Sequence, residues 1–350
     1  MRTVCTKDRS RLFEIGIIGT GTWGTALARM LCRIGHHVTC WSAVSEEIRQ
    51  LKVLHTHPNL PGVSLPEAIT FTENIDEVCG ESAILVFAVP SVYVRATAQK
   101  AVPFIREEQI VVDVAKGIEP DTLMTMTEII ADVWRRQSPG IHPRLVALSG
   151  PTHAEEVAAD MPTTIVAASK DQEAARQVQE AFSNQVMRVY TNADQKGVEI
   201  SGAMKNVMAL AAGIAAGMGY GDNLRAAIIT RGIAEIARLG KAMGCNIRTF
   251  AGLAGVGDLI VTASSVHSRN NRAGQLIGQG FSAAAAIDKV GMVVEGINAL
   301  PAAMKLSRRY HVEMPITEAL YAVLYEEADV REAVHKLLDR PKRHEYEKLS

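Results

Sequence analysis

The sequence has almost no imbalance of charge. Its 350 residues include 37 lysines and arginines against 38 aspartates and glutamates, which gives a formal net charge of −1. Nucleic acids and anionic membranes attract proteins that carry an excess of positive charge, so neither is expected as a partner. The expected ligand is a small molecule.

Cysteine is scarce and scattered, and none of the cysteines forms a CxxC pair: Cys5, Cys32, Cys40, Cys79 and Cys245. Such spacing gives neither a disulfide framework nor a zinc ribbon and favours a reducing, cytoplasmic setting. His55 and His57 are two possible metal ligands, but without cysteine or acidic partners nearby they are insufficient for a site. No metal is expected.

Long apolar runs are also missing. No stretch approaches the ~18 uninterrupted apolar residues of a membrane span. The first twelve residues are polar and lack the apolar segment of a signal peptide, so we expect residues 1–12 to form a loose tail. The chain is expected to be cytoplasmic, with no stable insertion into a membrane.

A strand, a glycine-rich turn and a helix follow this tail. An apolar run over 13–18 leads into GTGTWG and the helical pattern TALARMLCRIG, and a second apolar run covers 37–41. Gly19 permits a tight turn, Gly21 lets the backbone approach a pyrophosphate, and Gly24 allows close packing of the helix on the strand. Helix N–H groups then face the phosphates. This βαβ unit predicts a dinucleotide site, although other α/β folds also contain glycine-rich turns.

The end of the second strand lacks the residue that usually selects the cofactor. An acid there would bind the ribose of NAD and an arginine would bind the 2′-phosphate of NADP, but this chain has Ser42 and Ala43. The sequence therefore leaves NAD and NADP as alternatives.

The remaining pattern changes once along the chain. Further strands are predicted over 83–89, 110–114, 144–149, 163–169 and 186–190, with helices over 122–136 and 171–183 and with Ser91 and Thr152 as helix caps. After these come only helical patterns, over 194–219, 223–243, 270–280, 295–310, 315–327 and 330–339. The sequence thus predicts an α/β Rossmann-like doubly wound sheet in residues 13–191 and an all-α domain in residues 192–350.

One lysine lies within an unusually apolar helical segment. Lys205 is surrounded by small and apolar residues in VEISGAMKNVMALAAGIAAGMG, a pattern typical of a buried helix. The amine could reach the surface along its stem or pair with an acid such as Glu199. Alternatively, it lies in a cleft where desolvation lowers its pKa until it exchanges a proton with substrate.

Three other polar positions are candidates for ligand contact. Lys116 follows the strand over 110–114, at the edge where open α/β sheets bind ligands. Asp258 follows three glycines in GLAGVGDLIVT, and SRNNRAG combines polar side chains with a helix start that suits a phosphate. Taken singly, these residues could equally be a solvated lysine, a turn former and a capping motif.

Together these stretches resemble the NAD(P)-dependent glycerol-3-phosphate dehydrogenase family in its bacterial form. The similarity covers nearly the whole chain, through GTGTWGTALA, VPS, AKGI, GPTHAEEV, GAMKNVMALAAGI, ITRG, TFAGLAGVGDLIVT, SRNNRAG, VVEG and MPI. The resemblance implies reversible reduction of dihydroxyacetone phosphate to sn-glycerol 3-phosphate, which supplies glycerophospholipid synthesis. It also implies a Rossmann half, a helical half and a homodimer.

The resemblance implies roles for particular residues. Lys205 matches the family's proton donor and acceptor. The substrate-binding positions match Lys205 itself and Lys116, Gly150, Thr152, Asp258, Ser268, Arg269 and Asn270. Cofactor contacts beyond the three glycines match Thr22, Trp23, Lys116, Ala154, Arg269, Val293 and Glu295. Ala43 and His153 depart from the family's usual residues, and neither belongs to the chemistry.

Two other functions fit the same layout. A dehydrogenase of hydroxy acids or sugar acids would share the Rossmann half and the helices, but it would recognise a carboxylate. A nucleotide sensor would bind the cofactor without catalysis. The presence of both Lys205 and Lys116 argues against a sensor, since binding alone needs no proton donor.

Overall fold

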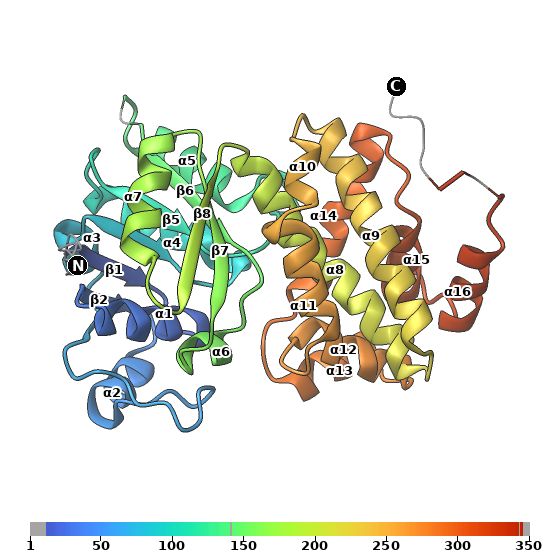
Figure 1. The fold of residues 1–350 in the computed structure, drawn as a ribbon, viewed down its shortest axis with the longest axis horizontal. Helices are drawn as coiled ribbons and strands as arrows, with labels where there is room; N and C mark the ends of the chain where they lie inside the picture. The colour runs from blue at the N-terminus through green and yellow to red at the C-terminus, as the bar shows by residue number, and fades with distance from the viewer. Residues whose placement is uncertain (1–11, 141, 343, 346–350) are drawn as a thin grey trace, which may run out of the picture.

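The computed structural model describes residues 12–140, 142–342 and 344–345. The tail that we expect over residues 1–12 therefore lies, apart from Leu12, outside the described residues. The protein has two halves side by side, one built on a β-sheet and one made of helices (Figure 1). The last strand ends at Asn192 and the first long helix begins at Gln195, so the change from one half to the other falls between these residues.

The described residues form an eight-stranded sheet in the order β3-β2-β1-β4-β5-β6-β7-β8. The strands are β1 (Glu14–Ile18), β2 (His37–Trp41), β3 (Thr70–Thr72), β4 (Ile84–Phe87), β5 (Ile110–Asp113), β6 (Arg144–Ser149), β7 (Thr163–Ala168) and β8 (Met187–Asn192). Neighbours pair in parallel except β6 and β7. The strand order reverses beside β1, and ligands bind at the carboxyl ends of strands at such a point.

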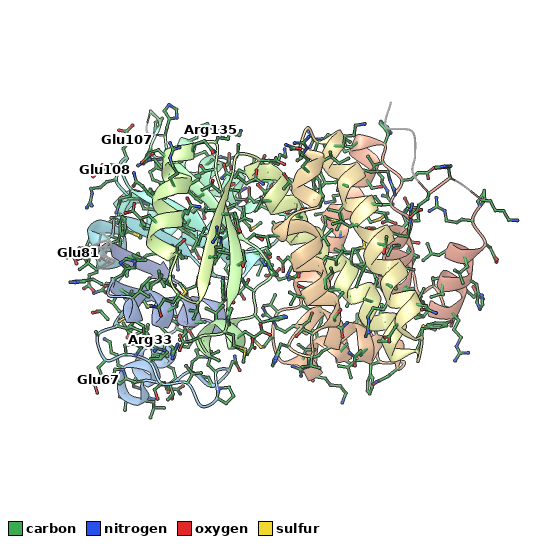
Figure 2. The ribbon with its side chains drawn as sticks, in the orientation of Figure 1. Arg33, Glu67, Glu81, Glu107, Glu108 and Arg135 are labelled. Carbon is green, nitrogen blue, oxygen red and sulfur yellow. The ribbon has the colours of Figure 1, made fainter. Side chains whose placement is uncertain are left out.

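Helices cover both faces of the sheet. Residues of α1 (Thr22–Arg33), α2 (Ser45–Leu54) and α7 (Gln172–Phe182) share one apolar cluster with the strands. Residues of α3 (Ile75–Glu81), α4 (Val94–Ala101) and α5 (Met126–Gln137) form the other. The predicted doubly wound class is confirmed. Charged side chains labelled in Figure 2, such as Glu67, Glu81 and Glu108, lie on the side of this half that faces away from the helical half.

The second half is built around α8 (Gln195–Gly217), which is buried along most of its length. Around it lie α9 (Asp222–Ala242), α10 (Ile247–Phe250), the π-helical turn η3 (Leu253–Gly257), α11 (Asp258–Ser264), α12 (Arg269–Gly278), α13 (Ala283–Val290), α14 (Glu295–Tyr310), α15 (Pro315–Tyr325) and α16 (Val330–Leu338). Figure 1 shows α16 at the outer end of this half. The predicted all-helical second half is confirmed.

Glycines bring α8 and α12 into backbone contact. A Cβ atom on Gly213 or Gly217 of α8 would overlap carbonyl oxygens of α12, and one on Gly274 or Gly278 of α12 would overlap carbonyl oxygens of α8. Small residues with this four-residue spacing let two helices approach closely along one line. The two helices therefore lie closer together than larger side chains at these positions would allow.

Two segments of the helical half are apolar enough to cross a membrane by length and composition alone, namely α8 and Ile247–Ser264. For α8, 83% of the apolar window is buried inside the protein. Core helices of soluble proteins pass the same test, so the two segments are weak grounds for a membrane span.

The structure differs from the predicted caps. Ser91 is not an N-cap but the first residue of η1 (Ser91–Tyr93), with Pro90 before it. Thr152 donates a hydrogen bond to Gly150 O at 3.2 Å, and His153 precedes α6 (Ala154–Ala158) instead. The helix expected from residue 122 begins at Met126, because Thr125 and Glu128 form a capping box there.

Candidate active site

The glycine turn lies between β1 and α1. Gly19 has φ +117°, a conformation that L side chains rarely adopt, and its N–H donates to Trp41 O at 2.8 Å. A Cβ atom on Gly24 would overlap Gly19 O, whereas one on Gly21 would have nothing within 4 Å. The backbone at Gly21 therefore borders open space, as the approach of a pyrophosphate requires.

The first residues of α1 suit an anion. Their N–H groups lack the intrahelical acceptors that later residues have, and no side chain caps this end of the helix. Thr22 Oγ1 is buried and has no hydrogen-bond partner among the described residues. Trp23 packs against the core of the sheet half. An unpaired buried hydroxyl beside free N–H groups fits a phosphate-containing ligand.

Lys205 lies in the middle of α8 and is turned inward, with only 6% of the residue exposed. Its Nζ donates to Asp258 Oδ1 at 2.6 Å and to Thr262 Oγ1 at 2.6 Å. Glu199, the acid named in the sequence-based alternative, instead accepts hydrogen bonds from Thr125 and Thr127. The amine is thus neither solvated nor paired with Glu199.

Asp258 connects the two halves of the molecule. It is the first residue of α11 and is 0% exposed. Its Oδ2 accepts a hydrogen bond at 2.5 Å from Nζ of Lys116, which follows β5, and the same amine lies 3.2 Å from Gly150 O after β6. One buried carboxylate therefore holds an amine from each half.

Burial and charge set the pKa of Lys205. Loss of water around the amine and the nearby charge of Lys116 lower its pKa, the Asp258 carboxylate raises it, and the net result is a pKa of about 7. An amine of this kind changes protonation near neutral pH. It can therefore donate or accept a proton in a reaction.

Glycines also let α8 approach the sheet beside this cluster. A Cβ atom on Gly202, one turn before Lys205, would lie 3.1 Å from Ser149 Oγ and 3.5 Å from Lys116 Cγ. A Cβ atom on Gly150 would lie 3.0 Å from Ile165 Cα. These close approaches bring Lys205, Lys116 and the end of β6 together.

The start of α12 contacts α8 at Asn206, the residue after Lys205. Ser268 caps this helix, because its Oγ accepts from Asn271 N at 3.2 Å. Asn270 Nδ2 donates to Asn206 Oδ1 at 2.9 Å, and its Oδ1 accepts from Gly296 N at 2.8 Å. Arg269 is exposed and makes no hydrogen bond or ion pair with other described residues. Its guanidinium is available to a ligand.

The remaining cofactor positions are spread over three elements. Ala154 begins α6 and is half-buried, and Val293 lies just before α14. Glu295 begins α14, and its carboxylate accepts from Ser91 N at 3.1 Å and from Ser91 Oγ at 2.5 Å. Glu295 therefore provides a second link between the two halves.

Sequence reasoning missed two side chains next to Lys205. Thr262 lies one turn after Asp258 on α11, in a stretch whose glycines concealed the helix. His153 has its ring 5.8 Å from that of His267, and burial and then the charge of Lys205 lower the pKa of His153. No motif in the sequence singled out Thr262, and His153 was noted only as a departure from the family's usual residue. Among the described residues, no group of three or more histidine, cysteine or acidic side chains could hold a metal ion.

Comparison with family models and with known proteins covers nearly the whole chain. Residues 14–175 match the model of the NAD-dependent glycerol-3-phosphate dehydrogenase N-terminus, and residues 194–335 match that of the C-terminus. The chain is 57% identical over 335 residues to glycerol-3-phosphate dehydrogenase [NAD(P)+] 2 of Lactobacillus delbrueckii subsp. bulgaricus, covering 96% of this chain and 99% of that protein. It is 48% identical to the Bacillus subtilis protein named glycerol-3-phosphate dehydrogenase [NAD(P)+], covering 96% and 97%.

The fold comparison gives the same result. The crystal structure of glycerol-3-phosphate dehydrogenase from Coxiella burnetii superimposes with a TM-score of 0.87 and 32% sequence identity, covering 94% of this chain and 99% of that one. The similarity thus extends over both the sheet half and the helical half.

Proposed function

The chain belongs to the NAD-dependent glycerol-3-phosphate dehydrogenase family, and we propose that it reduces dihydroxyacetone phosphate to sn-glycerol 3-phosphate, reversibly, with Lys205 as general acid and base. Membership makes it an oxidoreductase that depends on NAD or NADP. The single observation that carries the proposed mechanism is that Asp258, fully buried, binds both Lys205 and Lys116.

The residues around the glycine turn fit a dinucleotide. The open space beside Gly21 and the unpaired hydroxyl of Thr22 at the start of α1 suit its pyrophosphate. We propose that the cofactor is held by these residues and by Gly19, Trp23, Gly24, Lys116, Ala154, Arg269, Val293 and Glu295. When bound, its nicotinamide supplies the hydride for reduction.

Reduction of the ketone leaves developing negative charge on the carbonyl oxygen. An ammonium at Lys205 Nζ stabilises that charge and transfers its proton to the oxygen, which becomes the new hydroxyl. In the reverse direction the neutral amine accepts the proton from the alcohol. The pKa of about 7 lets one group serve both directions at neutral pH.

Asp258 and Lys116 position and tune this amine. The carboxylate fixes Lys205 Nζ at 2.6 Å and favours its charged form, while Lys116 on the other oxygen disfavours it. The substrate-binding set that we propose comprises Lys205 with Lys116, Gly150, Thr152, Asp258, Ser268, Arg269 and Asn270. In this set Arg269, exposed and without a partner among the described residues, supplies the guanidinium for the phosphate.

We further propose the setting of this reaction. Residues 13–191 act as the dinucleotide-binding domain and residues 192–350 as the domain for substrate and catalysis. The enzyme works in the cytoplasm as a homodimer and supplies glycerophospholipid synthesis. Size-exclusion chromatography with light scattering tests the dimer, because a monomer would have half the expected mass.

One spectrophotometric assay tests the activity. The purified protein is mixed with dihydroxyacetone phosphate and NADH or NADPH, and the loss of nicotinamide absorbance is followed. We expect turnover with the phosphorylated ketone and little with unphosphorylated dihydroxyacetone or a 2-keto acid. Turnover of the keto acid alone would favour a hydroxy-acid dehydrogenase, and binding without turnover would favour a sensor.

A further inference from the structure

The carboxylate of Glu47 lies beside the glycine turn at the end of β2, where Ser42 and Ala43 provide no acid. Glu47 is the third residue of α2, five positions beyond Ser42. Its Oε2 accepts hydrogen bonds from Ser42 Oγ at 2.8 Å and from Thr20 Oγ1 at 3.0 Å. Thr20 belongs to the glycine turn and Ser42 follows β2. The side chain of Glu47 therefore spans from α2 to the crevice between the first two strands.

The local structure explains why the carboxylate lies there. Ser42 Oγ accepts from Val44 N at 3.1 Å, which folds the chain tightly between β2 and α2. The first turn of α2 consequently lies over the end of β2, and no side chain caps its N-terminus. A carboxylate at the third helical position is favoured by the helix dipole. Figure 1 shows α2 below β2 and α1 in this view.

Glu47 retains capacity to bind a ligand. The residue is exposed, and among the described residues its Oε1 accepts no hydrogen bond, since both hydroxyl donors bind Oε2. In dinucleotide-binding folds an acid near the end of the second strand accepts hydrogen bonds from the adenosine ribose, and the pyrophosphate lies at the first glycine turn. Thr20 joins Glu47 to that turn.

The charges around Glu47 disfavour a further phosphate. Glu73, just after β3, accepts a hydrogen bond from Ser45 Oγ at the start of the same helix. Arg49, the first cation of α2, pairs with Glu46. Ala43, at the tip of the turn, offers no charge. A 2′-phosphate placed here would meet carboxylates without a free guanidinium.

We propose that Glu47 is a specificity-determining residue that binds the adenosine ribose of NAD and disfavours the 2′-phosphate of NADP. The proposal rests on the family's dependence on NAD or NADP, not on the role proposed for Lys205. It makes this chain an enzyme that prefers NAD. Glu47, which would bind the ribose, belongs to α2, the helix after β2, and not to the end of the strand itself.

The test measures binding of ligands that lack the nicotinamide ring, so Lys205 does not enter the result. Isothermal titration calorimetry compares ADP-ribose with 2′-phospho-ADP-ribose on the full-length protein. We expect ADP-ribose to bind at least about tenfold more tightly, because one charge-assisted hydrogen bond accounts for a factor of this size. In Glu47→Gln this ratio should fall about tenfold, since the amide can still accept from both hydroxyls but carries no charge.

Glu173→Gln is the matched control. Glu173 lies in the first turn of α7, and its carboxylate accepts from Arg176 at 3.1 Å and from Gln177 at 3.3 Å on its own helix. Its ratio should equal that of the wild type. A wild-type protein that binds the 2′-phospho ligand as tightly as ADP-ribose, or a Glu47→Gln variant with the wild-type ratio, would overturn the proposal. If the variant folds poorly, the comparison of the two ligands on the wild-type protein still tests the proposal.

Discussion

Replacement of Lys205 by alanine tests the proposed chemistry directly. The variant lacks the ammonium that transfers a proton to the carbonyl oxygen. General acid–base catalysis contributes a factor of at least about 100, so kcat for reduction of dihydroxyacetone phosphate should fall at least about 100-fold. This factor corresponds to about 2.7 kcal/mol of transition-state stabilisation.

The structure indicates that this variant will fold. Asp258 would otherwise become a buried, unpaired carboxylate, but its Oδ2 keeps the hydrogen bond to Lys116 Nζ at 2.5 Å. The glycine turn lies on the other half of the protein and is unchanged. The dissociation constant for NADH should therefore stay close to that of the wild type.

The assay follows the loss of NADH absorbance at saturating substrate. Lys196→Ala is the matched control, because Lys196 lies on the same helix and pairs with Glu128 near the surface. Its kcat should be close to that of the wild type. If Lys205→Ala kept more than about a tenth of the wild-type kcat, the amine would not be the proton donor, since even weak acid catalysis exceeds this factor. An equal loss in Lys196→Ala would attribute the effect to damage of the helix.

Three further predictions concern substrate, pH and packing. Arg269→Ala should raise the KM for dihydroxyacetone phosphate about tenfold, because it removes a charge-assisted hydrogen bond to the phosphate. Replacement of the exposed Arg272 by alanine should leave this KM unchanged, and steady-state assays of both variants measure the two values. The kcat/KM for reduction should fall as pH rises through about 7, because Lys205 of the free enzyme loses the proton that it must donate. The kcat/KM for oxidation should rise over the same interval, and pH–rate profiles measure both. Gly274→Ala should lower the free energy of unfolding by about 1–3 kcal/mol, because its Cβ would overlap Leu210 O. In thermal denaturation, Gly221→Ala is the control, since its Cβ meets nothing within 4 Å.

Much of the fold follows from the sequence because its strands are short apolar runs between clear breaks. β2 and β6 have the predicted bounds. β3 was missed because the three residues Thr70–Thr72 are too few to show a pattern. The helix α11 was missed because the glycines before Asp258 resemble a loop, yet they form a π-helical turn that leads directly into it.

The candidate site was less accessible to sequence reasoning. The sequence identified Lys205 by its apolar surroundings, but which acid it contacts depends on how α11 packs against α8, and this is a property of the tertiary structure. The sequence shows that Ser42 and Ala43 are not acidic, but it does not show that the carboxylate of Glu47 lies beside them. Glu47 reaches the same place from the next helix because the chain between β2 and α2 is folded tightly by Ser42.

The glycine contacts between α8 and α12 have a consequence for how substrate enters. Because the backbones of these two helices are in contact, we expect Lys205 and the turn at Arg269 to keep their spacing when substrate binds. We then expect room for the ketone to come from a movement of the helical half relative to the sheet half. Such a movement would break and re-form the contacts of Lys116 with Asp258 and of Ser91 with Glu295, which link the two halves.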